Sequence, residues 1–490
     1  MAQLPVWTNP SERKILYPDN EYLVAIYSVG YDKSQPVEQK IQQCLDYAKT
    51  DVAESVQVSI HSMTTTDVTE TNTKVQDFFN HKAAVFSDLT IAGLKSESYK
   101  DEKAKIIYAL AYAKKVDIVN HYKNEITQKK SEASGIISAA RALTDAGKKS
   151  QAIMKYYEAM SLIRIMEQDQ AILLALDPSQ YDGEISATGK SVNEAISALA
   201  NNPERTLEDA CFFIAEGLRN QVKVVSSPVT VSMFSYQDTQ MGSDFSFRLG
   251  SQLQQELVRQ GFNIVTTRSV NPNSTPETKV IYGTYWKENE NLNIMAIIRD
   301  PQSSRIIASA EATLPVSWLM TNNISYLPDN YNEALEQIKT FRKDEIINGG
   351  LMVELMTNHG KDNALYQEDD TLIMYVKVNR ECYVRVIYYQ ADGSKVLLQD
   401  DYFISADMAN KFIQLPDKNV ATAPFGVETL QLNAQTSRFQ PLPVKMSGGY
   451  KFIDEDLATI VTRTRGFKAV SEENLGAEKR ITITTVKKVN

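Results

Sequence analysis

The chain offers few side chains of the types and spacings that catalysis needs. Zinc hydrolases use paired histidines in motifs such as HExxH, and many serine hydrolases carry GxSxG, but neither motif occurs here. The four histidines are scattered along the chain: His61, His81, His121 and His359. The three cysteines are equally isolated and give no metal spacing and no disulfide framework: Cys44, Cys211 and Cys382. We therefore predict a non-enzymatic protein with no catalytic residue, no metal site and no cofactor.

Adjacent carboxylates are the one set that could supply a general acid and a general base. They occur at three places: Glu368-Asp369-Asp370, Asp400-Asp401 and Asp454-Glu455-Asp456. A glycosidase holds two carboxylates about 5 to 10 Å apart across a cleft, a distance that depends on the fold. None of the three groups has the spacing of a calcium-binding loop. We interpret them as solvated loop charge, with incidental calcium binding left open.

One short segment ends like a phosphate-binding loop. Thr188-Gly189-Lys190-Ser191 has the lysine and hydroxyl that would reach phosphate and magnesium. The first glycine of such a loop should occupy position 184, which is Glu184, and residues 173–176 belong to a predicted helix and not to a buried strand. We predict that this segment is a solvent loop that caps the next helix, and no nucleotide is expected.

Tyrosine is abundant, with 24 residues against 3 tryptophans. Tyr156-Tyr157 and Tyr388-Tyr389 each place one ring on either side of their element, so we predict that one ring of each pair is exposed. Exposed amphipathic rings suit contact with proteins or glycans. This reasoning gives a possible interaction surface made of Tyr389, Tyr388 and Tyr157, with a half-buried packing role as the alternative for each ring.

Length and charge limit the class of protein. At 490 residues the chain exceeds the size at which one hydrophobic core stops growing, so three or four domains are expected. The formal net charge is -9, and no long Lys/Arg block occurs, which argues against a nucleic-acid partner. No apolar run is long enough to span a membrane. The start, rich in proline and asparagine, is typical of a mature chain whose leader has been removed, so we predict export.

The N-terminal third alternates between helical and strand periods. Residues 37–54 are predicted to be a helix because apolar side chains recur at spacings of three and four: Val37, Ile41, Leu45 and Ala48. Residues 55–63 are predicted to be a half-buried strand because apolar and polar residues alternate there: Val56, Val58 and Ile60 face one way. Residues 64–74 are polar and are expected to extend that strand as an exposed edge or hairpin.

A helical pair is predicted next. An apolar stripe starting at Ile106 indicates a helix that continues to about residue 128. After it, a helix closing near Leu143, a turn at Asp145-Ala146-Gly147 and a second helix over 153–163 form a hairpin. This hairpin resembles one tetratricopeptide-like unit, with small or aromatic residues at the required places: Gly147, Ala152, Tyr156 and Ala159. A single unit cannot bury its own face, so we expect it to act as a connector.

The turn-rich segment 177–183 is predicted to be a domain boundary, and a second break at about residues 326–332, an exposed linker, separates the two remaining modules. After a helix capped by Thr206 and Asp209, the central module is predicted to contain a strand at 229–236, a helix at 249–257 and strands at 262–266, 279–286, 291–299 and 305–314. The last third has strand periodicity. Its clearest signal is a hairpin around Ala391-Asp392-Gly393, followed by strands at 426–432 and 481–486.

Three segments resemble modules of bacterial envelope proteins. Residues 7–124, with the Pro5-Val6-Trp7 start and Tyr17-Pro18, resemble small outer-membrane-associated lipoproteins, although the lipidated cysteine of that family is absent here. Residues 204–320 resemble the domain shared by a flagellar outer-membrane accessory protein and the curli-secretion lipoprotein, on the order of elements and on Ile281-Tyr282-Gly283-Thr284-Tyr285. Residues 354–445 are similar to a β-sandwich domain of unknown function appended to envelope proteins. The segment 383–398 carries this resemblance.

These observations predict an α+β multidomain protein. We expect an α+β N-terminal module over 1–125, a helical hairpin connector over 126–182, an α/β three-layer module over 183–325 and an immunoglobulin-like β-sandwich over 350–490. The resemblances imply an exported protein that is periplasmic, associated with the outer membrane or on the cell surface.

We expect the protein to be a non-enzymatic scaffold that binds other envelope proteins. It is also expected to self-associate through its central module. Membrane association is expected only if the native precursor is lipidated. The alternatives are an envelope hydrolase that acts on peptidoglycan or glycan through a carboxylate pair, and a soluble glycan- or peptide-binding protein.

Overall fold

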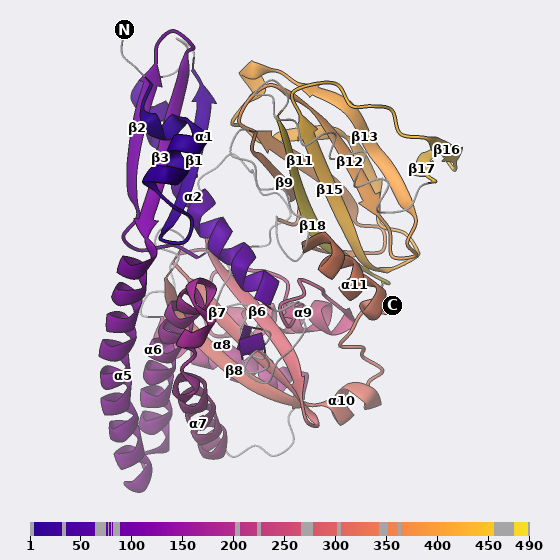
Figure 1. Ribbon diagram of the computed structural model, residues 1–490. Coiled ribbons are helices and arrows are strands. Elements are labelled where there is room, and N and C mark those ends of the chain that lie inside the picture. Colours follow the sequence, from indigo (N-terminus) through magenta and orange to yellow (C-terminus); the bar gives the residue numbers. More distant parts are fainter. Residues whose placement is uncertain are drawn as a thin grey trace.

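The computed structural model shows a mixed α+β protein of several packed units (Figure 1). It describes residues 4–31, 36–63, 75–76, 78–79, 81, 89–200, 206–222, 227–265, 278–300, 305–342, 351–360, 364–454 and 475–488. The predicted edge at 64–74 lies outside these residues. Among the described residues, no helix is long and apolar enough to cross a membrane.

The N-terminal unit is an antiparallel sheet with one long helix across it. Strands β1 (Tyr22–Gly30), β3 (Ile106–Lys114) and β2 (Lys95–Asp101) pair in the order β1-β3-β2. Helix α2 (Val37–Met63) covers one face. A short turn η1 (Val6–Thr8) and helix α1 (Pro10–Leu16) precede the sheet.

Two predictions for this unit are wrong. Residues 55–63 continue α2 and do not form a strand, because Val52, Val56 and Ile60, spaced by four, are buried while Val58 is only partly so. A pair of residues four apart fits a helix as well as a strand, and here the helix continues the stripe of Cys44 and Ala48.

Residues 106–114 form strand β3 and not the start of a helix. Ile107 and Leu110 point to opposite faces and both are fully buried. A segment that is buried on both faces is apolar at nearly every position, so its sequence shows no periodicity that would distinguish a strand from a helix. The helix begins directly after the strand, at Lys115.

The helical unit contains three helices. Helices α5 (Lys115–Asp145) and α6 (Lys149–Leu176) are antiparallel, and the turn between them uses Gly147 at φ +70°, so the predicted hairpin and its turn are confirmed. A short turn η2 (Pro178–Gln180) leads to α7 (Gly183–Ala200), which packs on α6. The expected boundary at 125/126 lies within α5, and α7, the first helix of the expected central module, packs on α6 and also bonds to Glu311 of the central unit through Asn193.

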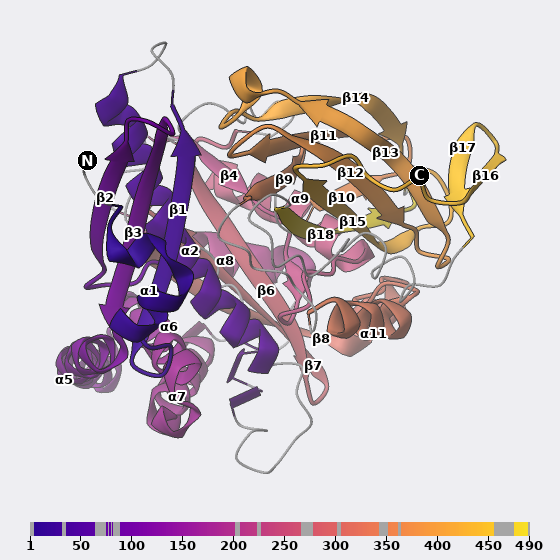
Figure 2. The ribbon, with the colours of Figure 1, turned by 45° about the horizontal axis from the view of Figure 1, so that its top comes forward.

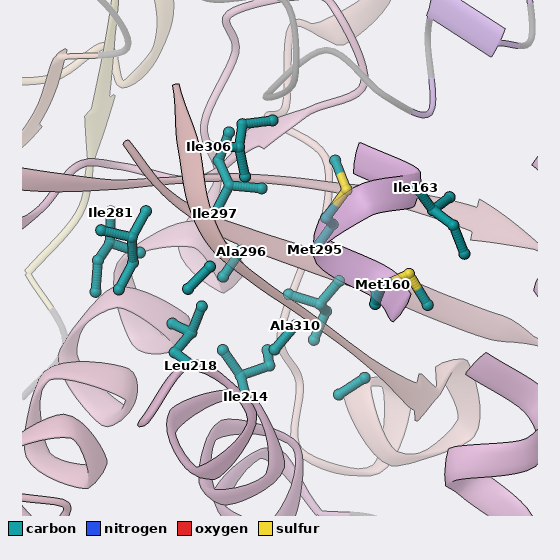
Figure 3. Close-up of a cluster of buried hydrophobic side chains, with 14 of the residues drawn as sticks. Met160, Ile163, Ile214, Leu218, Ile281, Met295, Ala296, Ile297, Ile306 and Ala310 are labelled. Carbon is teal, nitrogen blue, oxygen red and sulfur yellow. The ribbon is translucent and has the colours of Figure 1, made fainter. Parts of the chain in front are cut away.

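The central unit is a sheet in the order β4-β6-β7-β8, and β5 also pairs with β6. Its elements are α8 (Leu207–Gln221), β4 (Val229–Val231), β5 (Ser235–Tyr236), α9 (Asp244–Arg259), β6 (Lys279–Glu288), β7 (Asn291–Arg299) and β8 (Ile306–Pro315). The capping box of Thr206 and Asp209 is present as predicted. Side chains of α8 and α6 meet strands β7 and β8 in one apolar core (Figure 3).

The C-terminal unit is the predicted β-sandwich, preceded by α10 (Val316–Thr321) and α11 (Tyr331–Arg342). The large sheet has the order β10-β18-β15-β12-β13-β17-β16, and the small sheet the order β14-β11-β9. The strands are β9 (Val353–Thr357), β10 (Ala364–Gln367), β11 (Thr371–Val378), β12 (Cys382–Tyr389), β13 (Lys395–Ile404), β14 (Ile413–Val420), β15 (Gly426–Gln435), β16 (Val444–Ser447), β17 (Tyr450–Ile453) and β18 (Gly476–Val486). A turn η3 (Ala406–Met408) follows β13. The predicted hairpin joins β12 to β13.

The units are bonded to one another. Ser28 of β1 accepts hydrogen bonds from Asn379 (3.2 Å, to the carbonyl) and Arg380 (2.9 Å, to the hydroxyl) of the sandwich. The backbone N–H of Gly242 in the central unit donates to Thr484 Oγ1 of β18 at 2.9 Å. Figures 1 and 2 show the sandwich resting against both the N-terminal and the central unit.

The segment 326–332, between the central unit and the sandwich, makes hydrogen bonds to both of these units. The Tyr326 carbonyl accepts a hydrogen bond from Tyr285, and Asn330 bonds to Val427 through both its amide nitrogen and its amide oxygen, at 2.9 and 2.8 Å. This segment is therefore a bonded joint and differs from the exposed linker that its sequence indicates.

Candidate functional site

The tyrosine proposed as the centre of an interaction surface is in the interior. Tyr389 is 1% exposed and its ring lies 5.2 Å from that of Phe341 on α11. Its hydroxyl donates to Gln431 Oε1 of β15 at 3.0 Å. Helix α11 covers the outer face of the large sheet at this point, which is why a ring on the side away from the sandwich core is still buried.

The other tyrosines of the two pairs are not exposed either. Tyr388 is half-buried against the sandwich core, and Tyr156 and Tyr157 are both buried. Tyr157 lies so close to α8 that a Cβ atom on Gly217 would be 2.8 Å from its ring. The prediction of one exposed ring per pair is therefore wrong. For Tyr156 and Tyr157 the reason is that α6 is packed between α5, α7, α8 and β8.

Members of two of the three predicted carboxylate groups bond to cations. Asp400 accepts a 2.6 Å hydrogen bond from the guanidinium of Arg385, which is buried. Asp401 accepts from Arg438 at 3.0 Å, and Asp369 lies 3.4 Å from Lys488. Asp454 is exposed, and Glu455 and Asp456 lie outside the described residues. These contacts make the first two groups structural or surface charges.

Three carboxylates that the sequence does not single out have raised pKa values. Glu428 of β15 is 2% exposed and accepts a 2.5 Å hydrogen bond from the Tyr388 hydroxyl; burial raises its pKa to about 7. Asp51 of α2 is half-buried, and burial, with Glu54 and Glu354 nearby, raises its pKa to about 8. Burial raises the pKa of Asp169 in α6 to about 6, although Lys129 of α5 lies 3.4 Å away. All three positions are buried by contacts between distant segments, so their sequence neighbours give no signal.

A further buried charge network joins α6, α7 and β8. Arg164 is fully buried and bonds to Glu167 on its own helix and to Glu311 of β8, while Asn193 of α7 also bonds to Glu311. Buried pairs of this kind are costly to break but are weak indications of function. We assign this network to holding the helical unit against the central sheet.

Histidine and cysteine chemistry is not assembled at any described site. His359 Nδ1 lies 2.7 Å from the Leu365 carbonyl, and its ring stacks on Tyr366 at 4.2 Å. Burial raises the pKa of the three thiols, so they are poor nucleophiles at neutral pH: Cys44, Cys211 and Cys382. No group of three or more His, Cys, Asp or Glu side chains within the described part of the chain could hold a metal ion.

The loop-like segment Thr188 to Ser191 lies within α7, so the prediction that it forms a loop is wrong. The Thr188 hydroxyl donates to the Glu184 carbonyl at 2.7 Å, a bond within the helix, and Lys190 lies 2.9 Å from Glu288. Helix backbone N–H groups inside α7 are already bonded along the helix and cannot cradle phosphates.

Two small cavities of 290 and 270 Å³ lie next to each other on the helical unit. Both are lined by Ile137 and Arg141 of α5 and Thr188 of α7. Figure 2 views α5 and α7 nearly end-on, next to α6. Because α5 and α7 each pack on α6 and hardly on each other, the space between them stays open. We call this space the α5–α7 groove.

The α5–α7 groove has an apolar floor and small walls. The floor residues are at most 8% exposed: Ala133, Ile137, Met166, Ile185 and Val192. The walls are short side chains: Ser134, Ser138, Ala187, Thr188 and Ser191. One end is closed by Lys130, which bonds to Glu184 and lies 3.1 Å from Asp182. Arg141, at the other end, is exposed and has no ion-pair partner among the described residues.

No family model matches the chain, and no curated protein matches it significantly. Solved structures give weak likenesses. The LpoB C-terminal domains of Salmonella enterica and Escherichia coli are 13% and 15% identical, with TM-scores of 0.18 and 0.19; the matches cover 23% and 22% of this chain and 99% and 98% of those domains.

The secreted protein HP1454 of Helicobacter pylori is 12% identical with a TM-score of 0.17, over 65% of this chain and 94% of that one. At these TM-scores the likeness to envelope and secreted proteins is one of fold at most, and it carries no argument about function.

Proposed function

We propose that this protein is a non-enzymatic exported scaffold of the cell envelope or cell surface, which docks partner proteins. The observation that supports this most is that, among the described residues, no carboxylate with a raised pKa lines the α5–α7 groove. Glu428, Asp51 and Asp169 are absent from its lining, which consists of small and apolar side chains together with Lys130, Arg141 and Glu184. A hydrolase needs its activated base to face the substrate cleft.

The envelope location in this proposal is supported by the three sequence resemblances and is tested by fractionation. Cells that express the native gene are expected to hold the protein outside the inner membrane. Recovery of full-length protein in the cytosol alone would contradict the location and leave the docking role standing.

The hydrolase alternative is tested with the two carboxylates of the turn between β10 and β11, the exposed Asp369 and the half-buried Asp370. The double variant Asp369→Asn/Asp370→Asn should retain cellular function in a complemented deletion strain if the protein is a scaffold. Loss of function, in protein with an unchanged thermal melt, would favour the hydrolase or a calcium site. Asp400→Asn is a poor probe, because it leaves the buried Arg385 without its carboxylate and destabilises the fold.

A further inference from the structure

The hairpin formed by β16 and β17 projects from the edge of the large sheet in both views (Figures 1 and 2). Strand β17 pairs with β13 at a single residue pair, and β16 is the edge strand of the sheet. The base of the hairpin is anchored, because Leu442 and Ile453 are buried in the apolar cluster below α11. Its turn is open: Gly448 and Gly449 have the positive φ of a two-residue turn, and nothing lies within 4 Å of either Cβ position.

The hairpin carries one exposed apolar side chain on each face near its turn. Paired residues share a face, and side chains alternate along each strand. Met446, 61% exposed, therefore lies on the face of its partner Lys451, and Tyr450, 48% exposed, lies on the other face with Lys445. A sheet that packs on a folded partner has one apolar face and one polar face. Apolar side chains on both faces suit a medium that surrounds the tip.

The charge of the hairpin is opposite to that of the whole chain. Acidic residues number 61 among 490, and the formal net charge is -9. Residues 429–453, however, contain no Asp or Glu and three cations, Arg438, Lys445 and Lys451. Arg438 pairs with Asp401, whereas both lysines are exposed and have no ion-pair partner among the described residues. The hairpin is thus a cationic projection on an acidic protein, and its lysines attract an anionic surface.

We propose that the β16–β17 hairpin inserts its tip into the surface of a membrane that contains anionic lipids. Met446 and Tyr450 enter the boundary between headgroups and acyl chains, and the long stems of Lys445 and Lys451 return their ammonium groups to the lipid phosphates. Met446 lies two residues from the turn, about 7 Å at roughly 3.3 Å per residue, which matches the depth of about 5 to 10 Å that interfacial elements reach.

This contact uses the envelope location proposed above, which places the chain beside a membrane. Purified protein and vesicles test it without reference to that location. Failure of the vesicle experiment would therefore leave the scaffold proposal standing, and that proposal is judged by fractionation and complementation.

A second copy of the chain is the competing occupant, because β16 is an edge strand. The sequence of the edge opposes such pairing. Lys445 would have to lose water when a strand docks beside it, and Pro443, directly before the strand, has no N–H to donate. Lysine and proline are residues with which natural edge strands avoid pairing with other chains, so the edge favours the lipid surface.

Flotation of the full-length protein with vesicles tests the role of charge. Vesicles with about 30% phosphatidylglycerol in phosphatidylcholine should bind the protein at about 50 mM salt, and at least tenfold less at about 500 mM salt or without the anionic lipid. Lys445→Gln/Lys451→Gln should bind about 20-fold more weakly, at roughly fivefold for each lysine. Lys148→Gln/Lys149→Gln is the matched control, because it removes two exposed lysines from the α5–α6 turn, and it should bind as the wild type does.

The apolar tip is tested in the same assay. Met446→Ser/Tyr450→Ser should lose at least tenfold in binding to the anionic vesicles, because the lysines alone hold the protein at the surface without insertion. Val258→Ser/Met320→Ser removes two equally exposed apolar side chains from α9 and α10, and it should bind as the wild type does. Thermal melts of these variants should agree with that of the wild type, because the substituted side chains are exposed.

A fluorophore that responds to polarity measures insertion directly. It is attached to Ser447→Cys beside the turn, and the three native thiols are buried. Its emission should shift to the blue when anionic vesicles are added. The same fluorophore on Ser150→Cys, which is exposed at the start of α6, should not shift.

Four results would overturn the inference. The first is a wild-type protein that does not bind anionic vesicles, and the second is binding that Met446→Ser/Tyr450→Ser leaves unchanged. The third is a fluorophore at residue 447 that stays in a water-like environment on vesicle-bound protein. The fourth is a dimer in lipid-free solution that Met446→Ser/Tyr450→Ser dissociates, which would assign the hairpin to a second copy.

Discussion

The Tyr389 hydroxyl of β12 donates a hydrogen bond to Gln431 Oε1 of β15 at 3.0 Å, beneath helix α11. Tyr389→Asp would bury a carboxylate and leave the space of the ring unfilled, and the neighbouring Arg480 already pairs with Glu478, so we expect a loss of several kcal/mol in the free energy of unfolding. Tyr389→Phe removes only the hydrogen bond and should cost about 1 kcal/mol. Urea denaturation measures both, and a Tyr389→Asp protein as stable as the wild type would contradict the buried position.

Two fully buried glutamines differ in their hydrogen bonds and should respond in opposite ways to substitution by methionine. Gln431 bonds to Tyr389, Arg480 and Asn433, whereas neither amide atom of Gln170 in α6 has a partner among the described residues. Gln170→Met should stabilise the protein by about 1 kcal/mol, because it removes an uncompensated buried amide. Gln431→Met should destabilise it by about 2 kcal/mol or more. Equal effects on the denaturation midpoint would show that Gln170 is hydrogen-bonded.

A Cβ atom on Gly283 of β6 would lie 1.9 Å from the Phe234 ring. Gly283→Ala should therefore force the ring or the strand to move and lower the thermal midpoint strongly, since overpacked cores lose about 1 to 3 kcal/mol or more. Gly135→Ala in α5 is the control, because nothing lies within 4 Å of its Cβ position. That change should raise stability by about 0.5 to 1 kcal/mol.

Glu428 should make stability depend on pH. Burial raises its pKa to about 7 in the folded protein, from 4.5 in an ordinary environment, so the folded state favours the protonated form. The stabilising effect is complete below about pH 4.5 and is lost as pH rises through about 7, by up to roughly 3 kcal/mol at 1.36 kcal/mol per pH unit. Glu428→Gln can still accept the Tyr388 hydrogen bond but does not titrate. The difference between wild type and Glu428→Gln, measured by denaturation from pH 4 to 9, should shift in this direction; a constant difference would contradict the raised pKa.

The joint at residues 326–332 should resist proteases in the native protein. Asn330 bonds to Val427 from both ends of its amide and also donates to the Ala391 carbonyl. Asn330→Ala removes these bonds, and limited proteolysis should then cut near the joint, because local opening costs less. Rapid cleavage of the wild type there would show that the sandwich is linked loosely, as the turn-rich sequence of the joint suggests.

Features that depend on neighbouring residues were predictable from the sequence. The turn at Asp392-Gly393 sets the β12–β13 hairpin, the Thr206/Asp209 box begins α8, and Gly147 ends α5, because each is determined by backbone conformation within a few residues. The α+β class and the C-terminal sandwich follow from the same local periods, and both are confirmed.

Features that depend on what covers a segment were decided by the tertiary structure. Val56 and Ile60 fit a strand or a helix equally well, and only the packing of this part of α2 into the core that it shares with α6 selects the helix. Tyr389 is buried because α11 (residues 331–342) lies over the outer face of its sheet. The α5–α7 groove exists because both helices pack on α6 and make few contacts with each other. Burial and cavities depend on contacts between segments that are distant in the sequence. A local sequence pattern does not show which distant segment packs against it.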